Sequence, residues 1–413
     1  MTNYIDSTKD VLWVAIDIAK YTHVVLVEYP NKTRKKLTVQ NQLEDFEKLR
    51  TILMEPKLPV YVAFEPTADY HRNLAYFLKT SGFTCHFVSS IAVARTREAL
   101  FNTWDKNDPK DAQVILQLLK AGNTQVYHDP IIHQYNDVQE LSNTYHQVSK
   151  RKTRVYHSLV NHYLPLYFPE IEKYLCSSRG IWLIQFLLVF PTPLSITQHP
   201  KEVFVKLGSV IPGYKRFKNR WLSELYETAK KSVGLPSLET SVAIEMFKKT
   251  LLEYLHLCQS RESIEKQAAN YLTEQPDYQL LQSIPGIGPI IALTLLSETG
   301  NIRRFSHVKQ FINFCGFNLC AKQSGTFRGQ AHISKRGNAR LRQVLWMAGQ
   351  VAVTRTENTF RKKFDAFISK NGETPDNKRK AYTAIAIKMA RVIYAVLTKR
   401  TDYQGHYEPL VTQ

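Results

Sequence analysis

The chain has 413 residues, of which 44% are hydrophobic and 22% charged, a globular composition that excludes wholesale disorder. Its formal net charge is +19, and most of the excess lies late in the chain, where residues 301–413 hold 21 basic and 6 acidic side chains. A positive field of this size attracts polyanions, so we expect a nucleic acid as the partner.

The opening residues and the apolar runs indicate where the protein resides. Residues 1–10 lack the basic and then apolar pattern of a signal peptide. No uninterrupted apolar run approaches the roughly 18 residues of a membrane helix. We therefore expect a cytoplasmic protein that uses no membrane. The five cysteines form no Cys-x-x-Cys pair, which gives no support for a zinc site.

The first third of the chain has the pattern of an α/β domain. Runs of strand-forming residues predict strands over residues 11–17, 22–28, 33–39, 60–65 and 84–89. Helical spacing of apolar residues predicts helices over residues 43–53, 70–80 and 108–119. The first three strands should form a meander, and the alternation that follows favours one α/β domain over residues 8–125.

Two long helical patterns follow, over residues 134–167 and 238–273. A long polar helix does not bury its apolar face alone, so we expect a helical arm or antiparallel coiled coil over residues 126–275. Prolines interrupt the segment between the two patterns, which predicts an inserted helical subdomain at about residues 170–240.

Residues 276–413 predict an all-α C-terminal domain. Near its start, Gly286 and Gly288 lie in a turn between two helical segments, as in a helix-hairpin-helix element. The backbone N–H groups of such glycines can approach a phosphate, although a plain glycine turn explains the pattern too. Further on, Lys335, Arg336 and Arg340 are suited to phosphate contact, or they form a solvated basic face.

Four acids stand out by position. Asp17 closes the first strand, Glu65 closes the strand over residues 60–65, and Asp108 and Asp111 lie one helical turn apart. A carboxylate in apolar surroundings is destabilised unless it is paired or binds a cation. Oxygen ligands without nearby His or Cys favour Mg²⁺, or Mn²⁺, over zinc. Two such ions could clamp a phosphodiester.

Each acid also has a simpler explanation. A helix cap would account for Asp108 or Asp111, and a strand end would account for Glu65. Asp69 and Asp105 are alternative acids nearby, and Asp105 shares the helical phase of Asp108 and Asp111.

These residues lie in segments that resemble the DEDD transposases of the IS110 insertion-sequence family, which includes the Piv-type DNA invertases. The N-terminal segments are VAIDIAKYTHVVLV, VAFEPTADYHRNLAYFL and KNDPKDAQVIL. The C-terminal segments are SIPGIGPIIALTLLSETGNIRRF, FCGFNLCAKQSGTFRGQAHISKRGNARLRQVLWMAGQVA and KRKAYTAIAIKMARVIYAVL. Residues 170–240 depart in length from the compact members of the family.

The resemblance implies a RuvC-like, ribonuclease-H-type fold for the N-terminal domain, with Asp17, Glu65, Asp108 and Asp111 as its four acids. It favours Asp108 over Asp105, because the paired aspartates follow a lysine, here Lys106. It also implies a nucleophilic serine in a Ser-Gly motif, which Ser324 matches. Lys106 and Arg328 join the expected nucleic-acid contacts.

The resemblance further implies a transposase that cuts and rejoins donor and target DNA through a transient phosphoserine. A structured non-coding RNA from the element would guide it, and a dimer or tetramer would combine acids of one subunit with Ser324 of another. Three alternatives stay open: a site-specific DNA invertase, a structure-selective junction nuclease that never rejoins, and a non-catalytic nucleic-acid chaperone.

Overall fold

The structure is a computed structural model. It describes residues 10–101, 108–132, 135–175, 180–212, 218–320, 323–324, 327–328, 332–354 and 357–405. The chain divides into two compact units, Met1–Tyr135 and Asn136–Gln413.

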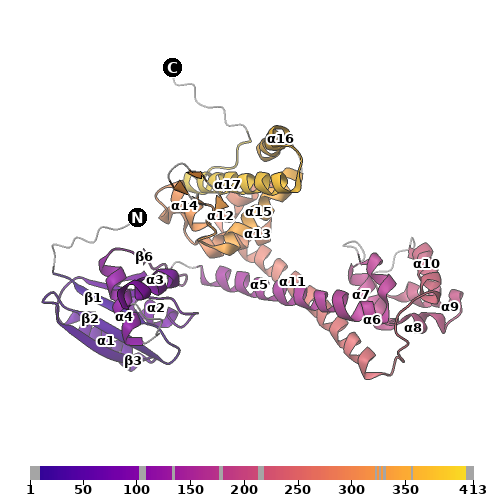
Figure 1. Cartoon of the computed structure of the whole chain (residues 1–413), viewed down its shortest axis with the longest axis horizontal. Helices are drawn as coiled ribbons and strands as arrows, with labels where there is room; N and C mark the ends of the chain where they lie inside the picture. The colour runs from indigo at the N-terminus through magenta and orange to yellow at the C-terminus, as the bar shows by residue number, and fades with distance from the viewer. Residues whose placement is uncertain are drawn as a thin grey trace, which may run out of the picture. The chain divides into compact units, whose positions relative to one another are not determined.

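The first unit, drawn in indigo and purple in Figure 1, is built on a mixed sheet with the strand order β3-β2-β1-β4-β5-β6. The strands are β1 (Leu12–Asp17), β2 (Thr22–Glu28), β3 (Arg34–Gln40), β4 (Val60–Phe64), β5 (Thr84–Phe87) and β6 (Gln125–Val126). β1 to β3 form the expected antiparallel meander, and β4 and β5 continue the sheet parallel to β1. This order fits a ribonuclease-H-type fold.

Helices cover both faces of this sheet. α1 (Leu43–Met54) and α2 (Arg72–Thr80) pack on one face, where Val14, Ile16 and Val62 are fully buried or nearly so. α3 (Ser90–Phe101) and α4 (Asp108–Lys120) cover the other face. There the small residues Ala15 and Ala63 allow α4 to approach β1 closely.

The first unit extends about ten residues beyond the predicted boundary at residue 125. β6 pairs with β5, and Tyr127 is buried in the core beneath α2. A strand of two residues is too short to show alternation, so this extension had no signal in the sequence.

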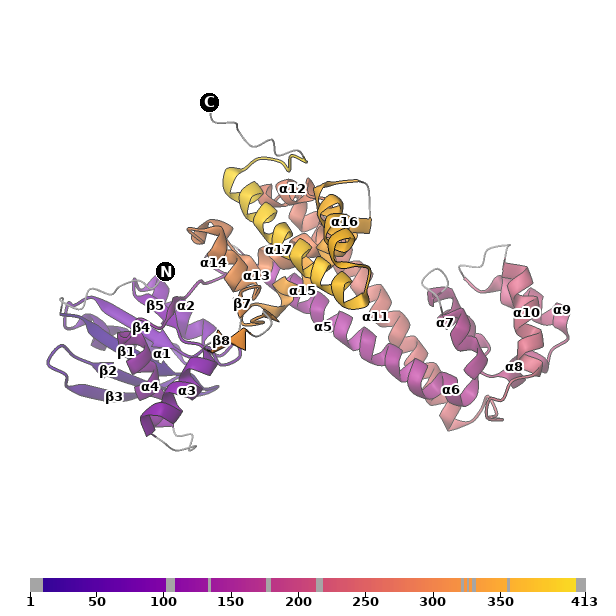
Figure 2. The same ribbon diagram turned by 45° about the horizontal axis from the view of Figure 1, so that its top comes forward.

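The second unit begins with an arm of two long helices, α5 (Asn136–Ser158) and α11 (Val242–Thr273), which lie side by side (Figure 2). The Tyr145 hydroxyl donates to Glu265 at 3.0 Å, and the Tyr271 hydroxyl donates to Asp137 at 3.2 Å. Residues early in one helix therefore contact residues late in the other, so the two helices are antiparallel. The arm is helical as expected, and the finer coiled-coil geometry stays a prediction.

The segment between α5 and α11 folds around a core of its own. It contains a π-helical turn (Leu159–Tyr163), a 3-10 helix (Pro169–Tyr174), α6 (Leu164–Tyr167), α7 (Gly180–Val189), α8 (Pro193–Thr197), α9 (Lys201–Val210) and α10 (Lys218–Lys230). Aromatic residues dominate this core, with Phe186 in ring contact with Trp182, Phe204 and Trp221. The predicted inserted subdomain is thus a packed unit.

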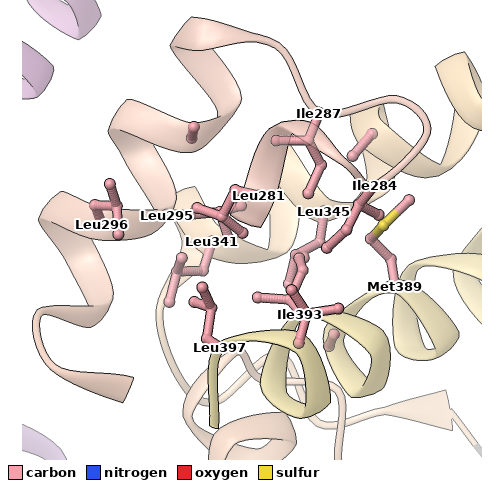
Figure 3. Close-up of a cluster of buried hydrophobic side chains, with 14 of the residues drawn as sticks. Leu281, Ile284, Ile287, Leu295, Leu296, Leu341, Leu345, Met389, Ile393 and Leu397 are labelled. Atoms are coloured by element: carbon pink, nitrogen blue, oxygen red, sulfur yellow. The ribbon is translucent and has the colours of Figure 1, made fainter. Parts of the chain in front are cut away.

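The remaining helices form the C-terminal core. They are α12 (Pro276–Gln282), α13 (Pro289–Thr299), α14 (Val308–Phe314), α15 (Ala339–Thr354), α16 (Thr359–Asn371), α17 (Pro375–Lys399) and a 3-10 turn (Ile302–Arg304). Met389, Ile393 and Leu397 of α17 face Leu341 and Leu345 of α15 in this core (Figure 3). α17 is long and apolar enough to cross a membrane by composition, but core helices of soluble proteins pass the same test.

The prediction of an all-α C-terminal domain is wrong in one respect. Short strands pair there in two small sheets, β7 (Leu319–Cys320) with β10 (His332–Ile333) and β8 (Gln323–Ser324) with β9 (Phe327–Arg328). Each strand has two residues, so none produces the alternating pattern by which strands are predicted.

Candidate active site

Asp17 and Glu65 come together through the register of the sheet. β1 and β4 are parallel neighbours with Ile16 opposite Phe64, so Asp17 and Glu65 follow at adjacent positions. Side chains alternate between the two faces of a strand, and Asp17 therefore shares the face of Ala15, the face that α4 covers. Both acids are half-buried at this edge of the sheet.

Asp111 reaches the same face from α4. Its neighbour Ala112 packs with Ala15 and Ala63 in the core beneath the helix. Only 1% of Asp111 is exposed, and its Oδ1 accepts a hydrogen bond from Arg97 Nε of α3 at 2.5 Å. The sequence reasoning missed Arg97, because its partnership depends on how α3 packs against α4 and no motif marks it.

The fourth acid is described by its backbone alone. Asp108 begins α4, one turn before Asp111, and its side chain lies outside the described residues, as do Lys106 and the alternative acid Asp105. Among the side chains that the structure does describe, no three His, Cys, Asp or Glu groups form a metal site. Three of the four acids are nonetheless placed on the same face of the sheet by strand register and helix packing.

His71 lies on the other face of the sheet. Its ring is 5.6 Å from the ring of Phe64 and 5.7 Å from that of Tyr127, both in the core with α1 and α2, and burial lowers its pKa below the ordinary value. The three acids whose side chains are described, Asp17, Glu65 and Asp111, offer carboxylate oxygens, the ligands that Mg²⁺ and Mn²⁺ prefer.

Ser324 lies in the second unit, in the short hairpin of β8 and β9, with its backbone paired to Phe327. Its side chain and that of Arg328 are outside the described residues. Two backbone hydrogen bonds join the residues before the hairpin to those after it, which we call the base of the hairpin. Ser334 N donates to Asn318 O at 2.7 Å, and Asn338 N donates to Phe314 O at 2.7 Å.

Two glycines, Gly316 before the hairpin and Gly337 after it, allow the two chain segments at the base of the hairpin to approach each other. Gly337 has φ +133°, and a Cβ there would lie 2.6 Å from both Gly316 N and Phe314 O. Gly316 has φ +77°, and a Cβ there would meet the Arg342 guanidinium. Arg342 donates to Cys315 O and Lys335 O, both at 3.3 Å. Arg342 therefore ties both sides of the base to the start of α15.

The residues predicted to contact nucleic acid differ in exposure and in their partners. Lys335 and Arg336 are exposed beside Gly337. Arg340 instead forms an ion pair with Glu298 at 2.8 Å, and its Nη1 also donates to Asn143 of α5 at 2.5 Å. Arg340 thus joins α15 to α13 and α5, a structural role that the sequence did not reveal.

The glycine turn between α12 and α13 also has a structural explanation. Gly286 has φ +90°, and a Cβ there would lie 2.3 Å from Ala348 O and 2.9 Å from Ala352 N of α15. Gly288, the N-cap of α13, has open space around its α-carbon. Close packing against α15 therefore accounts for Gly286, while its phosphate contact and that of Gly288 stay predictions.

Two family models match the two ends of the chain. A transposase model of the DEDD, IS110 type matches residues 14–169, and the model described as the transposase IS116/IS110/IS902 family matches residues 278–365. Both models describe transposases, which gives the class of protein, and together they match more than half of the chain. The chain belongs to the IS110 family of transposases.

Curated relatives agree with this family. The chain is 33% identical over 131 residues to the transposase for insertion sequence element IS1111A of Coxiella burnetii, covering 31% of this chain and 35% of that protein. It is 30% identical over 151 residues to the transposase for IS1328 of Yersinia enterocolitica, covering 36% of this chain and 44% of that protein. The alignments thus span less than half the length of these two relatives.

A solved structure, T. thermophilus RuvC in complex with a Holliday junction substrate, is similar over 28% of this chain and 99% of that chain, with 9% identity and a TM-score of 0.21.

Proposed function

We propose that this protein is an insertion-sequence transposase that cuts and rejoins DNA. The observation that supports the proposal is the position of Asp17, Glu65 and Asp111 on one face of the sheet, which follows from strand register and the packing of α4. Acids on one face suit phosphoryl transfer, because a cation bound by them would stabilise the charge that develops on a phosphate.

Asp17, Glu65, Asp108 and Asp111 would hold the metal, which we expect to be Mg²⁺, with Mn²⁺ as a substitute. A bound ion of this kind would supply positive charge to the phosphate and clamp its oxygens. The all-carboxylate donor set fits such an ion. Arg97 holds the Asp111 carboxylate in place when no ion is bound.

Ser324 would supply the nucleophile. Its hydroxyl oxygen attacks the phosphorus and gives up its proton, and the bond from phosphorus to one deoxyribose oxygen breaks, so that this oxygen leaves and is protonated. The resulting phosphoserine conserves the energy of the phosphodiester. A free hydroxyl of another DNA end then attacks the same phosphorus, and the serine oxygen leaves, which regenerates Ser324 and rejoins the strand.

The partners in this proposal are donor and target DNA, with a structured non-coding RNA of the element as guide. The net charge of +19 supports binding to such polyanions. A homo-oligomer, a dimer or tetramer, would bring the acids of one subunit to Ser324 of another. Lys106, Arg328, Lys335 and Arg336 would contact nucleic-acid backbone, and the protein would act in the cytoplasm.

A strand-transfer assay with labelled donor and target DNA tests the proposal. We expect Asp17→Asn to abolish joined product, at least a thousandfold, whereas Asp69→Asn, the same change at an exposed acid nearby, should leave it unchanged. A covalent protein–DNA adduct should form with the wild type and disappear in Ser324→Ala. Equal activity in Asp17→Asn and Asp69→Asn would refute the acidic site.

The same variants separate the rival functions. If Ser324→Ala still cuts DNA at the wild-type rate, the protein is a junction nuclease and not a recombinase. Mixing inactive Asp17→Ala chains with inactive Ser324→Ala chains should restore joining when the site is shared between subunits. If mixing restores nothing while subunits exchange, each subunit carries a complete site.

A further inference from the structure

Three cations gather where α16 packs against α17. Lys363 comes from α16, and Lys388 and Arg391 come from α17. Met389 and Ile393 of α17 point into the C-terminal core (Figure 3), so Lys388 and Arg391, which lie one turn apart, occupy a different side of the helix. Lys363 and Arg391 are exposed, and Lys388 is half-buried.

Three of the other cations of these two helices have acidic partners. Lys378 pairs with Glu373 at 2.7 Å, Lys380 pairs with Asp376 at 2.7 Å, and Arg361 lies 3.8 Å from Asp365. Within the described residues, Lys363, Lys388 and Arg391 have no carboxylate within 4 Å. Within the part of the chain that the structure describes, the charge at this position is therefore uncompensated.

The three cations also act on one another. Partial burial and the Arg391 guanidinium lower the pKa of Lys363, and partial burial and Lys363 lower the pKa of Lys388. The geometry agrees with these effects, because Lys388 Nζ donates to Thr359 O, and Thr359 lies one turn before Lys363 on α16. Like charges held close together destabilise the fold. Binding of an anion would relieve this repulsion, and the relief would contribute to the affinity for the anion.

Lys388 is held in position by contacts with α16. Its Nζ donates to Thr359 O at 2.6 Å and lies 5.1 Å from the centre of the Phe360 ring. A flexible lysine side chain loses conformational entropy when it binds an anion. These contacts already restrict Lys388, so binding of an anion would cost less entropy. The ammonium retains donors for a second partner.

The positive surface continues along α17. Lys399 lies eleven residues after Lys388 on the same helical phase, about 16 Å along the axis, and it is exposed. A row of this length fits a polyanion better than a single small anion. No aromatic side chain of α16 or α17 is among the exposed large hydrophobic residues, whereas single-stranded nucleic acids are usually bound through stacked bases.

We propose that Lys363, Lys388 and Arg391 form a binding site for the phosphate backbone of duplex DNA. The site rests on the proposed function for the choice of DNA as the polyanion. It lies apart in sequence from the acids and from Ser324, so it would contribute to affinity and leave the chemistry to those residues. Contacts to phosphate position a duplex without reading its sequence.

The test measures binding of the full chain to a labelled 30-base-pair DNA duplex over a series of salt concentrations, in EDTA so that no metal contributes. We expect Lys363→Gln/Arg391→Gln to weaken binding on the order of tenfold at low salt. It should also reduce the slope of log K against log salt by about 2, since each phosphate contact contributes about 0.9.

The matched control is Lys249→Gln/Lys266→Gln on α11, which removes the same charge from cations paired with Glu245 and Glu262. It should leave the salt slope unchanged. A second readout excludes misfolding: without DNA, Lys363→Gln should raise the melting temperature on the order of 1 °C, because it relieves repulsion.

Three results would overturn the proposal. The first is a wild-type salt slope in the double variant. The second is an equal loss of slope in the control variant, which would show that net charge alone matters. The third is that binding of an RNA duplex depends on Lys363 and Arg391 while binding of the DNA duplex does not, which would reject DNA as the ligand. DNA binding in EDTA requires no catalysis. A failure of strand transfer, which would contradict the proposed function, therefore does not affect the outcome of this binding test.

Discussion

Asp111 is a buried carboxylate whose charge is balanced by Arg97, and a metal ion would compete for it. If Asp111 holds the proposed ion, it must turn its oxygens to the ion, and the Arg97 guanidinium would lose its partner or move aside. Part of the metal's binding energy would then be offset by the ion pair that it breaks. On this proposal Arg97 would stabilise the protein without metal and weaken its affinity for metal.

We expect Arg97→Gln to separate these two effects. Without metal, the variant should lose about 3 kcal/mol of unfolding free energy in the first unit, because Asp111 stays buried without a counter-charge. With Mn²⁺ or Mg²⁺, the variant should gain more stability than the wild type, because no guanidinium competes for the site. Thermal melting over a series of metal concentrations measures both effects.

Arg34→Gln is the control for this experiment. Arg34 donates to Glu28 at 2.8 Å, and Glu28 is a carboxylate of the same unit that is only 3% exposed and lies away from the acidic edge. Its loss should lower stability without changing the response to metal. An identical metal response in Arg97→Gln and the wild type would show that Arg97 does not oppose metal binding.

At the scale of elements, the turn between α12 and α13 depends on Gly286. Alanine there would combine a φ of +90° with a contact 2.3 Å from Ala348 O, and a backbone oxygen within a helix cannot move aside. We expect Gly286→Ala to lower the free energy of unfolding of the second unit by about 3 kcal/mol or more. Chemical denaturation followed by circular dichroism measures the change.

Gly288→Ala tests the alternative role of this turn. With open space around it and φ −107°, the substitution should cost about 0.5–1 kcal/mol as a weakened N-cap. If this turn binds phosphate through its N–H groups, Gly288→Ala should weaken DNA binding more than it lowers stability. A stability loss equal to that of Gly286→Ala would contradict the packing explanation for Gly286.

The elements that were predictable are those with a long periodic signal. β1, β2 and β4 are apolar runs, and α4 begins with a capping residue and proline, so their type and bounds followed from the sequence. α3 was missed because its apolar residues are not confined to one face. β6 to β10 have two residues each, which is too short for any period.

The residues of the candidate site also divide into those that the sequence predicts and those that it does not. Asp17 and Glu65 were predictable because a charge closes each apolar strand, and parallel register then places the two side by side. Arg97 and the structural use of Arg340 were not predictable. Both depend on which helices pack together, and single-residue ion pairs across helices leave no pattern along the chain.

At the scale of the whole molecule, each unit has its own hydrophobic core. Units with separate cores unfold separately unless a large interface couples them. We expect at least two transitions in differential scanning calorimetry, because the inserted subdomain adds a third core, with Arg97→Gln and Gly286→Ala lowering the midpoints of different transitions. A single transition that both variants shift equally would show that the units unfold as one.

The antiparallel arm has a consequence for synthesis of the chain on the ribosome. Val138, at the start of α5, packs in the same core as Ala268 and Met389. The first unit can fold once residue 135 has emerged, but the C-terminal core closes only after some 250 further residues. During that delay the inserted subdomain can complete its own core and shorten the effective loop to be closed. In this sense the insertion would serve the assembly of the chain.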